Sequence, residues 1–173
     1  MNHASLTQVC SLITQVQLPN VSGLKVLDLA CGSGRNGLWF LAQGAHVTFI
    51  DRDISALNGF NHLRAETLQW NLEDGSAPIL PVEAFDIVLV FNYLHRPLFD
   101  QIAHCIKPQG LILYETFTWQ QAEIGRPRNP DFLLMPNELS MVFANWRPLH
   151  YFEGLLAEAD NRSYKAQLVA QKP

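Results

Sequence analysis

Two acidic residues and two glycines occupy the positions in this sequence where ligand chemistry is most expected. Asp28 lies in the apolar run 25–29, Gly32 and Gly34 follow it, and Asp51 comes at the end of the next apolar run. A strand that breaks into a glycine-rich turn and restarts as a helix turns backbone N–H groups toward the polar end of a nucleotide-like ligand. This pattern predicts a nucleotide-type binding site.

The glycine turn by itself leaves two kinds of nucleotide open. Residues 32–37 match the G-x-G-x-x-G pattern, and Asp51 follows at about the spacing of a ribose-binding carboxylate, which favours NAD(P) and an oxidoreductase. Asp28, however, would repel a pyrophosphate at the helix N-terminus and suits a ligand that is cationic there. S-adenosylmethionine is such a ligand, because its methionine part carries an ammonium and a sulfonium group.

Residues 26–34 resemble the first motif of the class I S-adenosylmethionine-dependent methyltransferases, and the resemblance runs through most of the chain. It implies that the two glycines let the backbone approach the methionine moiety, with Asp28 near the ammonium group. It also implies that Asp51 holds the ribose hydroxyls, with Asn71 near the adenine amino group and Leu72 beside the ring. The cofactor-binding residues implied in this way are Asp28, Ala30, Gly32, Gly34, Asp51, Arg52, Asn71, Leu72 and Asn92.

The elements that must position these residues alternate between strands and helices, which is typical of a parallel sheet with right-handed crossovers. The last two strands have only a turn between them and therefore predict an antiparallel hairpin at the sheet edge. The expected fold is α/β, a single-domain Rossmann-like methyltransferase fold with a mostly parallel seven-stranded sheet, an antiparallel edge hairpin and helices on both faces. We expect strands at 25–29, 46–50, 67–70, 85–91, 111–116, 148–153 and 164–170, and helices at 35–43, 55–63 and 97–106.

Two segments lie outside this alternation. Apolar residues recur at helical intervals over 5–17, so we expect 1–22 to be a short N-terminal helical segment that packs on the sheet or folds over a ligand. Residues 117–136 are polar and proline-rich, and a loop of that length in a compact domain is usually functional or disordered. We expect a short helix at 137–143 and a single methyltransferase domain over 1–173, with 117–136 as its substrate-side loop.

Residues that follow the central strands are candidates for the methyl acceptor site, since ligands of such sheets bind outside the carboxyl ends of the strands. Tyr93 and His95 are candidates to orient or deprotonate the acceptor, and Glu115 is a candidate base. The structural alternative for Tyr93 is a role in packing. The structural alternative for His95 is a position at the start of a helix or on the surface. Arg126 and Arg128 form a candidate clamp for an oxyanion or carboxylate.

The segments 92–97 and 114–117, together with the loop 125–130, are similar to small bacterial proteins of the tellurite-resistance methyltransferase group. This resemblance leaves the acceptor open. A catalytically silent S-adenosylmethionine-binding protein, acting as a regulator or a partner subunit, is the third possibility.

Composition sets broad limits on the function. The 173 residues are 48% hydrophobic and 16% charged, and the net charge of -4 argues against a sequence-independent nucleic-acid binder. Three isolated cysteines give neither a disulfide framework nor a zinc site and suit a reducing cytoplasm. No apolar run approaches the length of a membrane span. We expect a cytoplasmic protein that is a monomer or a homodimer, contains no metal and acts on a small molecule.

Overall fold

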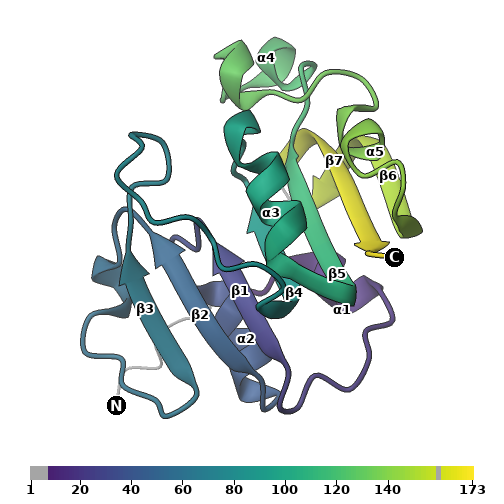
Figure 1. Cartoon of the computed structure of the whole chain (residues 1–173). Helices are drawn as coiled ribbons and strands as arrows, with labels where there is room; N and C mark the ends of the chain where they lie inside the picture. Colours follow the sequence, from purple (N-terminus) through teal and green to yellow (C-terminus); the bar gives the residue numbers. More distant parts are fainter. Residues whose placement is uncertain (1–7, 159–160) are drawn as a thin grey trace. The chain divides into compact units, whose positions relative to one another are not determined.

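The structure, a computed structural model, describes residues 8–158 and 161–173 (Figure 1). The chain divides into two compact units, Met1–Pro78 and Ile79–Pro173, and each is described by itself.

The first unit is a parallel three-stranded sheet in the order β3-β2-β1, with α2 packed against β1 and β2. The core strand β1 is buried at four consecutive positions, as expected for a parallel strand covered on both faces. These strands and α2 confirm the predicted alternation. The elements are α1 (Ser11–Gln15), β1 (Lys25–Leu29), α2 (Arg35–Ala42), β2 (His46–Asp51), a 3₁₀ turn η1 (Ser55–Leu57) and β3 (Ala65–Gln69).

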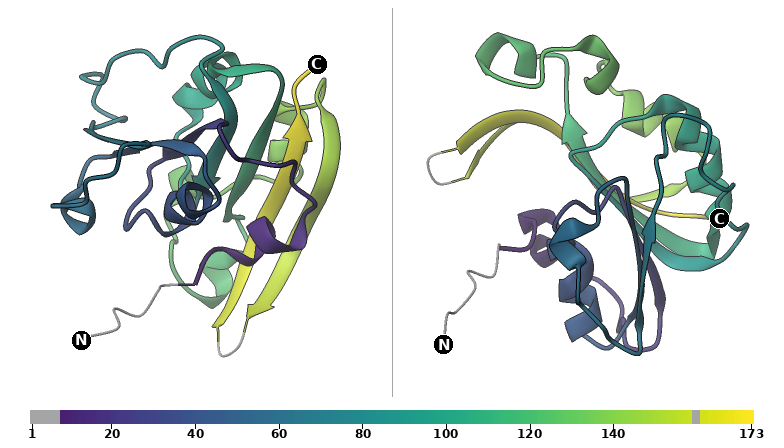
Figure 2. Two further views of the ribbon diagram at one scale, coloured as in Figure 1. Left: turned by 90° about the horizontal axis from the view of Figure 1, so that it is seen from below. Right: turned by 90° about the vertical axis from the view of Figure 1, so that its left-hand side faces the viewer.

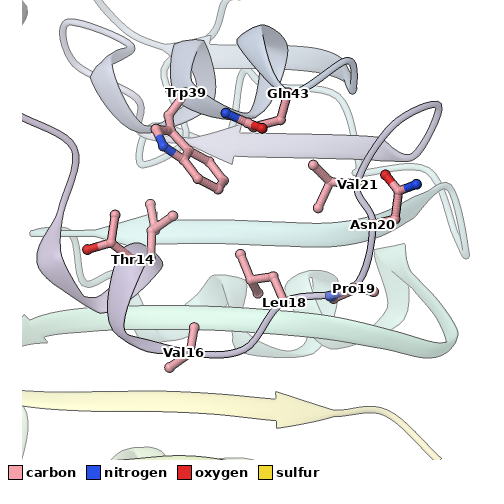
Figure 3. Close-up of a pocket in the computed structure, with 9 residues that line it drawn as sticks. Thr14, Val16, Leu18, Pro19, Asn20, Val21, Trp39 and Gln43 are labelled. Carbon is pink, nitrogen blue, oxygen red and sulfur yellow. The ribbon is translucent and has the colours of Figure 1, made fainter.

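The N-terminal segment contains the short helix α1. Leu12 and Ile13 are fully buried, whereas residues 1–7, which the predicted helix 5–17 partly covers, lie outside the described residues. A pocket between this segment and α2 is lined by Ile13, Val16, Leu18 and Trp39 among others (Figure 3).

The predicted helix at 55–63 is wrong. Only the single turn η1 forms, and Gly59 then adopts a positive φ of 78° that interrupts helical geometry. A short helix needs an apolar face packed against the protein to be stable. Here only Leu57 is buried, and Phe60 and Leu63 are exposed, so a longer helix would gain little from packing.

The second unit is a mixed sheet in the order β4-β5-β7-β6, in which β4 and β5 are parallel and β7 pairs antiparallel with both β5 and β6. The hairpin at the sheet edge is therefore confirmed. Its outer part extends beyond the end of β5, as Figure 2 shows, since β7 pairs with β5 only from Lys165 onward. The elements are β4 (Phe85–Phe91), η2 (Arg96–Leu98), α3 (Phe99–Cys105), β5 (Ile106–Phe117), α4 (Gln121–Ile124), η3 (Pro130–Phe132), α5 (Glu138–Val142), β6 (Arg147–Glu158) and β7 (Asn161–Gln171).

Strand β5 begins at Ile106, five residues before the predicted start at Leu111. The residues between the predicted helix 97–106 and the predicted strand 111–116 pair with the end of the chain. The N–H of Gln109 donates to the carbonyl of Lys172, whose own N–H donates to the carbonyl of Gly110. This pairing joins segments far apart in sequence, so local turn signals could not reveal it.

Candidate functional site

The glycine turn after β1 holds three residues in the left-handed region. Ala30, Gly32 and Gly34 have φ values of 55°, 54° and 73°. Alanine rarely adopts such a conformation, and strained residues of this kind cluster at functional sites. The turn is closed by the N–H of Gly34, which donates to the carbonyl of Cys31 at 2.8 Å. The backbone is therefore fixed in advance of any ligand.

The structure brings two of the predicted cofactor residues together. Asp51 Oδ2 accepts from the N–H of Gly32 at 2.8 Å, and Oδ1 accepts from the N–H of Asp53 at 3.0 Å. A Cβ placed on Gly32 would meet no atom within 4 Å, so this side of the turn is open. Each carboxylate oxygen can accept a further bond. The half-buried Asp51 therefore keeps capacity for the hydroxyl groups of a ligand.

The other two glycines of the motif face the protein interior. A Cβ on Gly34 would lie 2.9 Å from Leu57 Cδ2, and a Cβ on Gly37 would overlap the ring of Phe49 and lie 2.8 Å from Asp28 Oδ2. Close packing of helix against strand, rather than close approach of a ligand, thus requires a glycine at 37. The sequence motif contained Gly37, but the predicted set of site residues omitted it.

Asp28 is only 2% exposed, and its Oδ2 accepts from the N–H of Gly37 at 2.8 Å. Burial raises the pKa of Asp28 to about 7, and the nearby Asp51 adds to this, while the Gly37 hydrogen bond and Arg35 act in the opposite direction. A strongly shifted carboxyl beside an open turn is typical of a functional site. A cation bound nearby would favour its charged form.

Asn36 and Arg35, which were not predicted as site residues, attach the N-terminal segment to the start of α2. The buried Asn36 accepts from the N–H of Cys10 at 2.9 Å, and Arg35 donates to the carbonyl of Gln8 at 3.0 Å. The signal available in the sequence was a polar asparagine within the apolar pattern of the predicted helix 35–43. These two contacts place residues 8–10 at the N-terminal turn of α2.

The remaining predicted residues of the first unit lie beyond β2 and β3. Arg52 is exposed, and its carbonyl accepts from Gln69 Nε2 at 3.1 Å. Asn71 is exposed and uses its Oδ1 to accept from the N–H of Glu73 at 3.1 Å, while Leu72 is half-buried. Their contacts to a cofactor stay predictions.

Three predicted residues of the second unit follow β4. Asn92 is exposed with a φ of 55°, and its N–H donates to the carbonyl of Glu115 at 2.8 Å. The carbonyl of Tyr93 accepts from the hydroxyl of Tyr114 at 3.1 Å, and the half-buried His95 directly precedes η2. These bonds fix the segment to β5, and the chemical roles of its side chains stay predictions.

Glu115 lies inside the sheet of the second unit and is 3% exposed. Lys165 Nζ donates to its Oε1 and Gln167 Nε2 to its Oε2, both at 2.7 Å. Gln167 is also paired with His150 at 3.0 Å. A base must give up such bonds before it can take a proton from an acceptor. The arrangement therefore favours a structural role for Glu115.

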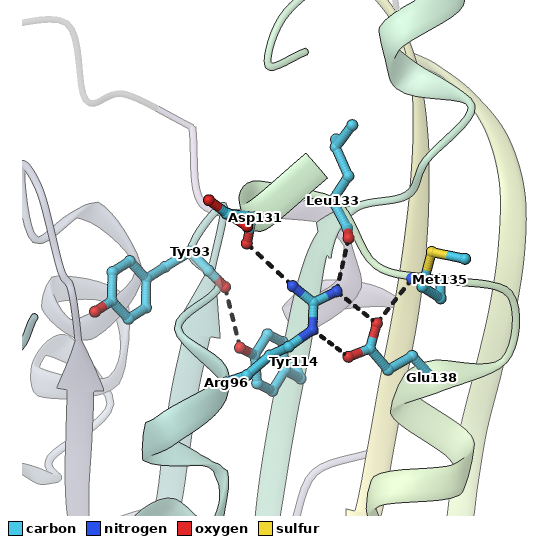
Figure 4. A network of polar contacts seen from close by, with 7 residues as sticks. All are labelled: Tyr93, Arg96, Tyr114, Asp131, Leu133, Met135 and Glu138. Atoms are coloured by element: carbon cyan, nitrogen blue, oxygen red, sulfur yellow. Dashed lines mark hydrogen bonds and ion pairs between the residues drawn. The ribbon is translucent and has the colours of Figure 1, made fainter. Parts of the chain in front are cut away.

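Arg96 holds the loop that follows β5, and the sequence prediction missed it (Figure 4). It forms a bidentate pair with Glu138 at 2.6 and 2.8 Å and donates to the carbonyls of Asp131 and Leu133. Burial favours a higher pKa for Glu138, but the bonds from Arg96 and from the N–H of Met135 outweigh it and lower the pKa. One side chain thus makes four hydrogen bonds to three residues of the segment 131–138.

We expect Arg96→Met to lower the free energy of unfolding by about 1–2 kcal/mol, a range discounted for partial exposure of the pair. Urea denaturation measures this loss of stability. Hydrogen exchange at the backbone amides of residues 131–138 should become faster in the same variant. Arg96→Lys keeps the charge but not the planar fork, so it should recover less than half of the loss. Full recovery by lysine would contradict the importance of the fork.

Arg126 and Arg128 lie close together in the second unit. Both are exposed, and both line one pocket with Pro127, Asn129 and Phe132. The loop 117–136 is more ordered than predicted, because it contains α4 and η3 and is closed by a bridge between Thr118 and Leu134.

The comparisons with known proteins agree with this geometry. Residues 26–110 match the family model described as a methyltransferase domain. The chain is 27% identical over 147 residues, 78% of its length, to a probable S-adenosyl-L-methionine-dependent methyltransferase, TehB, of Haemophilus influenzae. It is 30% identical over 112 residues, 56% of its length, to the ubiquinone biosynthesis O-methyltransferase of Xylella fastidiosa. The chain spans half or less of these two relatives, 50% and 43%.

Solved structures define the class of fold. The crystal structure of TehB from Haemophilus influenzae matches 88% of this chain and 59% of its own, with a TM-score of 0.72 and 21% identity. An S-adenosylmethionine-dependent methyltransferase from Mesorhizobium loti matches 94% of this chain and 96% of its own, with a TM-score of 0.73 and 17% identity. The Rossmann-like methyltransferase fold is therefore confirmed.

The predicted resemblance to S-adenosylmethionine-dependent methyltransferases is confirmed as well, since TehB is similar to this chain in both sequence and fold. The matched family model and both sequence relatives are methyltransferases, and the relative from Haemophilus influenzae and the solved structure from Mesorhizobium loti are named for their dependence on S-adenosylmethionine. Within the described part of the chain, every helix is too short or too polar to cross a membrane.

Proposed function

We propose that this protein transfers a methyl group from S-adenosylmethionine to a small-molecule acceptor. The observation that carries the proposal is the open turn at Gly32, held against the carboxylate of Asp51 at 2.8 Å. A backbone that a ligand can approach closely, next to an acceptor of hydroxyl bonds, suits the ribose and methionine parts of this donor.

The residues of the first unit each have a distinct part in this proposal. Asp51 accepts bonds from the ribose hydroxyls, and Gly32 leaves room for the donor. Asp28 supplies a buried carboxyl group next to the turn, and a bound ammonium group would favour its charged form. We propose Ala30, Gly34, Arg52, Asn71 and Leu72 as the remaining cofactor contacts of this unit, and Asn92 as the cofactor contact of the second unit.

The bound donor supplies a carbon activated by sulfonium, so the protein has mainly to align the acceptor and exclude water. Tyr93 and His95 are the proposed orienting groups for the acceptor. The tight pairing of Glu115 with Lys165 and Gln167 supports an acceptor that needs little help from a base, such as a thiol. We place the activity in the cytoplasm, in one functional domain over residues 1–173, on the evidence of the isolated cysteines and the composition.

Titration with S-adenosylhomocysteine tests the cofactor half of the proposal. We expect Asp51→Asn to weaken its binding by about 1–3 kcal/mol, because bonds to a charged acceptor are lost. Asn retains one oxygen that can accept from Gly32 or Asp53, so the turn should stay folded. Isothermal titration calorimetry measures the affinity, and thermal unfolding checks the fold.

The matched control is Asp53→Asn, since Asp53 is an exposed carboxylate two residues away whose Oδ1 accepts from the N–H of Ser55. Its affinity for S-adenosylhomocysteine should equal that of the unchanged protein. Binding of NAD(P) without binding of S-adenosylhomocysteine would replace the proposal with the oxidoreductase alternative.

Donor consumption across thiols, amines, phenols and oxyanions tests the transfer itself. Turnover with at least one class is expected. Tight donor binding without turnover on any class would instead favour the silent regulatory or partner protein.

A further inference from the structure

The loop pocket of the second unit is a built feature of the protein. It is lined by Arg126, Pro127, Arg128, Asn129 and Phe132. Two arginines, a proline and a phenylalanine thus line one pocket within seven consecutive residues. Loops on the surface are often mobile, but hydrogen bonds hold this one on both sides.

Gln121 anchors one side of the pocket from a buried position, at 5% exposure. Its Nε2 donates to the carbonyl of Arg126 at 2.9 Å, and its Oε1 accepts from the N–H of Tyr164 at 2.8 Å. Arg128 Nε donates to the carbonyl of Gly125 at 3.2 Å. The backbone that carries both arginines is thereby tied to strand β7.

Asn129 and Arg96 anchor the other side. Asn129 Oδ1 accepts from the N–H of Asp131 at 3.0 Å, and its carbonyl accepts from the N–H of Phe132 at 3.0 Å. The bonds from Arg96 to the carbonyls of Asp131 and Leu133 fix the next residues. Phe132 stays 45% exposed although its backbone is held. The loop therefore presents an apolar ring at low entropic cost.

The charge of the pocket is not balanced from within. Neither Arg126 nor Arg128 forms an ion pair with a carboxylate of residues 8–158 or 161–173, in contrast to Arg96, Lys107 and Lys165. Guanidinium groups match carboxylates and other oxyanions in shape and charge. Pro127 and Phe132 add an apolar surface that a bare inorganic ion would not use.

We propose that this pocket binds a small organic acid, with its carboxylate on Arg126 and Arg128 and its flat apolar part against Phe132. This site goes beyond the proposed methyl transfer, and its occupation does not depend on the methyl donor.

Benzoate tests the proposal on the full-length protein, with the arginine Nε–Hε signals followed by NMR. We expect benzoate to shift the signals of Arg126 and Arg128 and to bind roughly tenfold or more tightly than benzamide, acetate or inorganic phosphate. Arg126→Gln/Arg128→Gln should lower benzoate affinity at least about tenfold. Phe132→Ala should reduce benzoate to the affinity of acetate.

Arg147→Gln is the control, because Arg147 is exposed on β6 and outside the pocket. It should leave benzoate binding unchanged. Equal affinity for benzamide would overturn the charge recognition, and equal affinity for acetate or phosphate would overturn the apolar part. Unchanged benzoate binding in the folded double variant would overturn the site itself.

Discussion

Asp28→Asn is expected to stabilise the protein above pH 7 and to weaken its binding of S-adenosylhomocysteine. The raised pKa of Asp28, about 7, means that the folded state holds a proton at pH 4–7 that the unfolded state has lost. The free energy of unfolding therefore falls as the pH rises through this window. Asparagine has no charge to bury, so the free energy of unfolding of the variant should be higher by on the order of 2–4 kcal/mol at pH 8.

The affinity of the unchanged protein for S-adenosylhomocysteine should move in the opposite direction. A ligand ammonium favours ionised Asp28, so affinity should rise from pH 6 to pH 8, whereas the variant should show a flatter profile. At pH 8 the variant should bind roughly tenfold more weakly, as expected for loss of one charge contact.

Urea denaturation and calorimetry at pH 6, 7 and 8 measure the two effects, with Asp53→Asn as the exposed control. Lower stability of Asp28→Asn at pH 8 would show that the buried charge stabilises the fold. If the variant bound S-adenosylhomocysteine with the same pH profile as the unchanged protein, Asp28 would not interact with the ligand.

Gly37→Ala is expected to lower the free energy of unfolding by about 2 kcal/mol, although alanine favours helices. The added Cβ would overlap the ring of Phe49 and lie 2.8 Å from Asp28 Oδ2, and both partners are buried. The helix would have to move away from β1 and β2. Urea denaturation measures the loss.

Gly32→Ala is the matched partner, because its Cβ would meet nothing within 4 Å. Its stability cost is the strain of a positive φ, about 1 kcal/mol, while its affinity for S-adenosylhomocysteine should fall sharply. If Gly32→Ala lost more stability than Gly37→Ala, this would contradict the conclusion that Gly32 is open and Gly37 is packed. Undiminished ligand affinity in Gly32→Ala would remove the open turn from the site.

Much of the fold could be predicted because its signals are local. The strands 25–29 and 85–91 were placed at their observed bounds, since fully buried parallel strands appear as continuous apolar runs. The hairpin followed from two β-like runs with too little chain between them for a crossover. The prediction of a helix at 55–63 was wrong because periodicity alone does not show whether the apolar side chains have a core to pack against.

The sequence by itself determined the glycine turn, the two acids beside it and hence the class of cofactor that we propose, because these depend on residue types at fixed spacing. Only the tertiary structure decided which glycine is open and which is packed, since that depends on Phe49 and Leu57 from other elements. It also decided the surroundings of Glu115, whose partner Lys165 lies on β7. The anchors Arg96 and Gln121 bind backbone far along the chain, so no local pattern marks them.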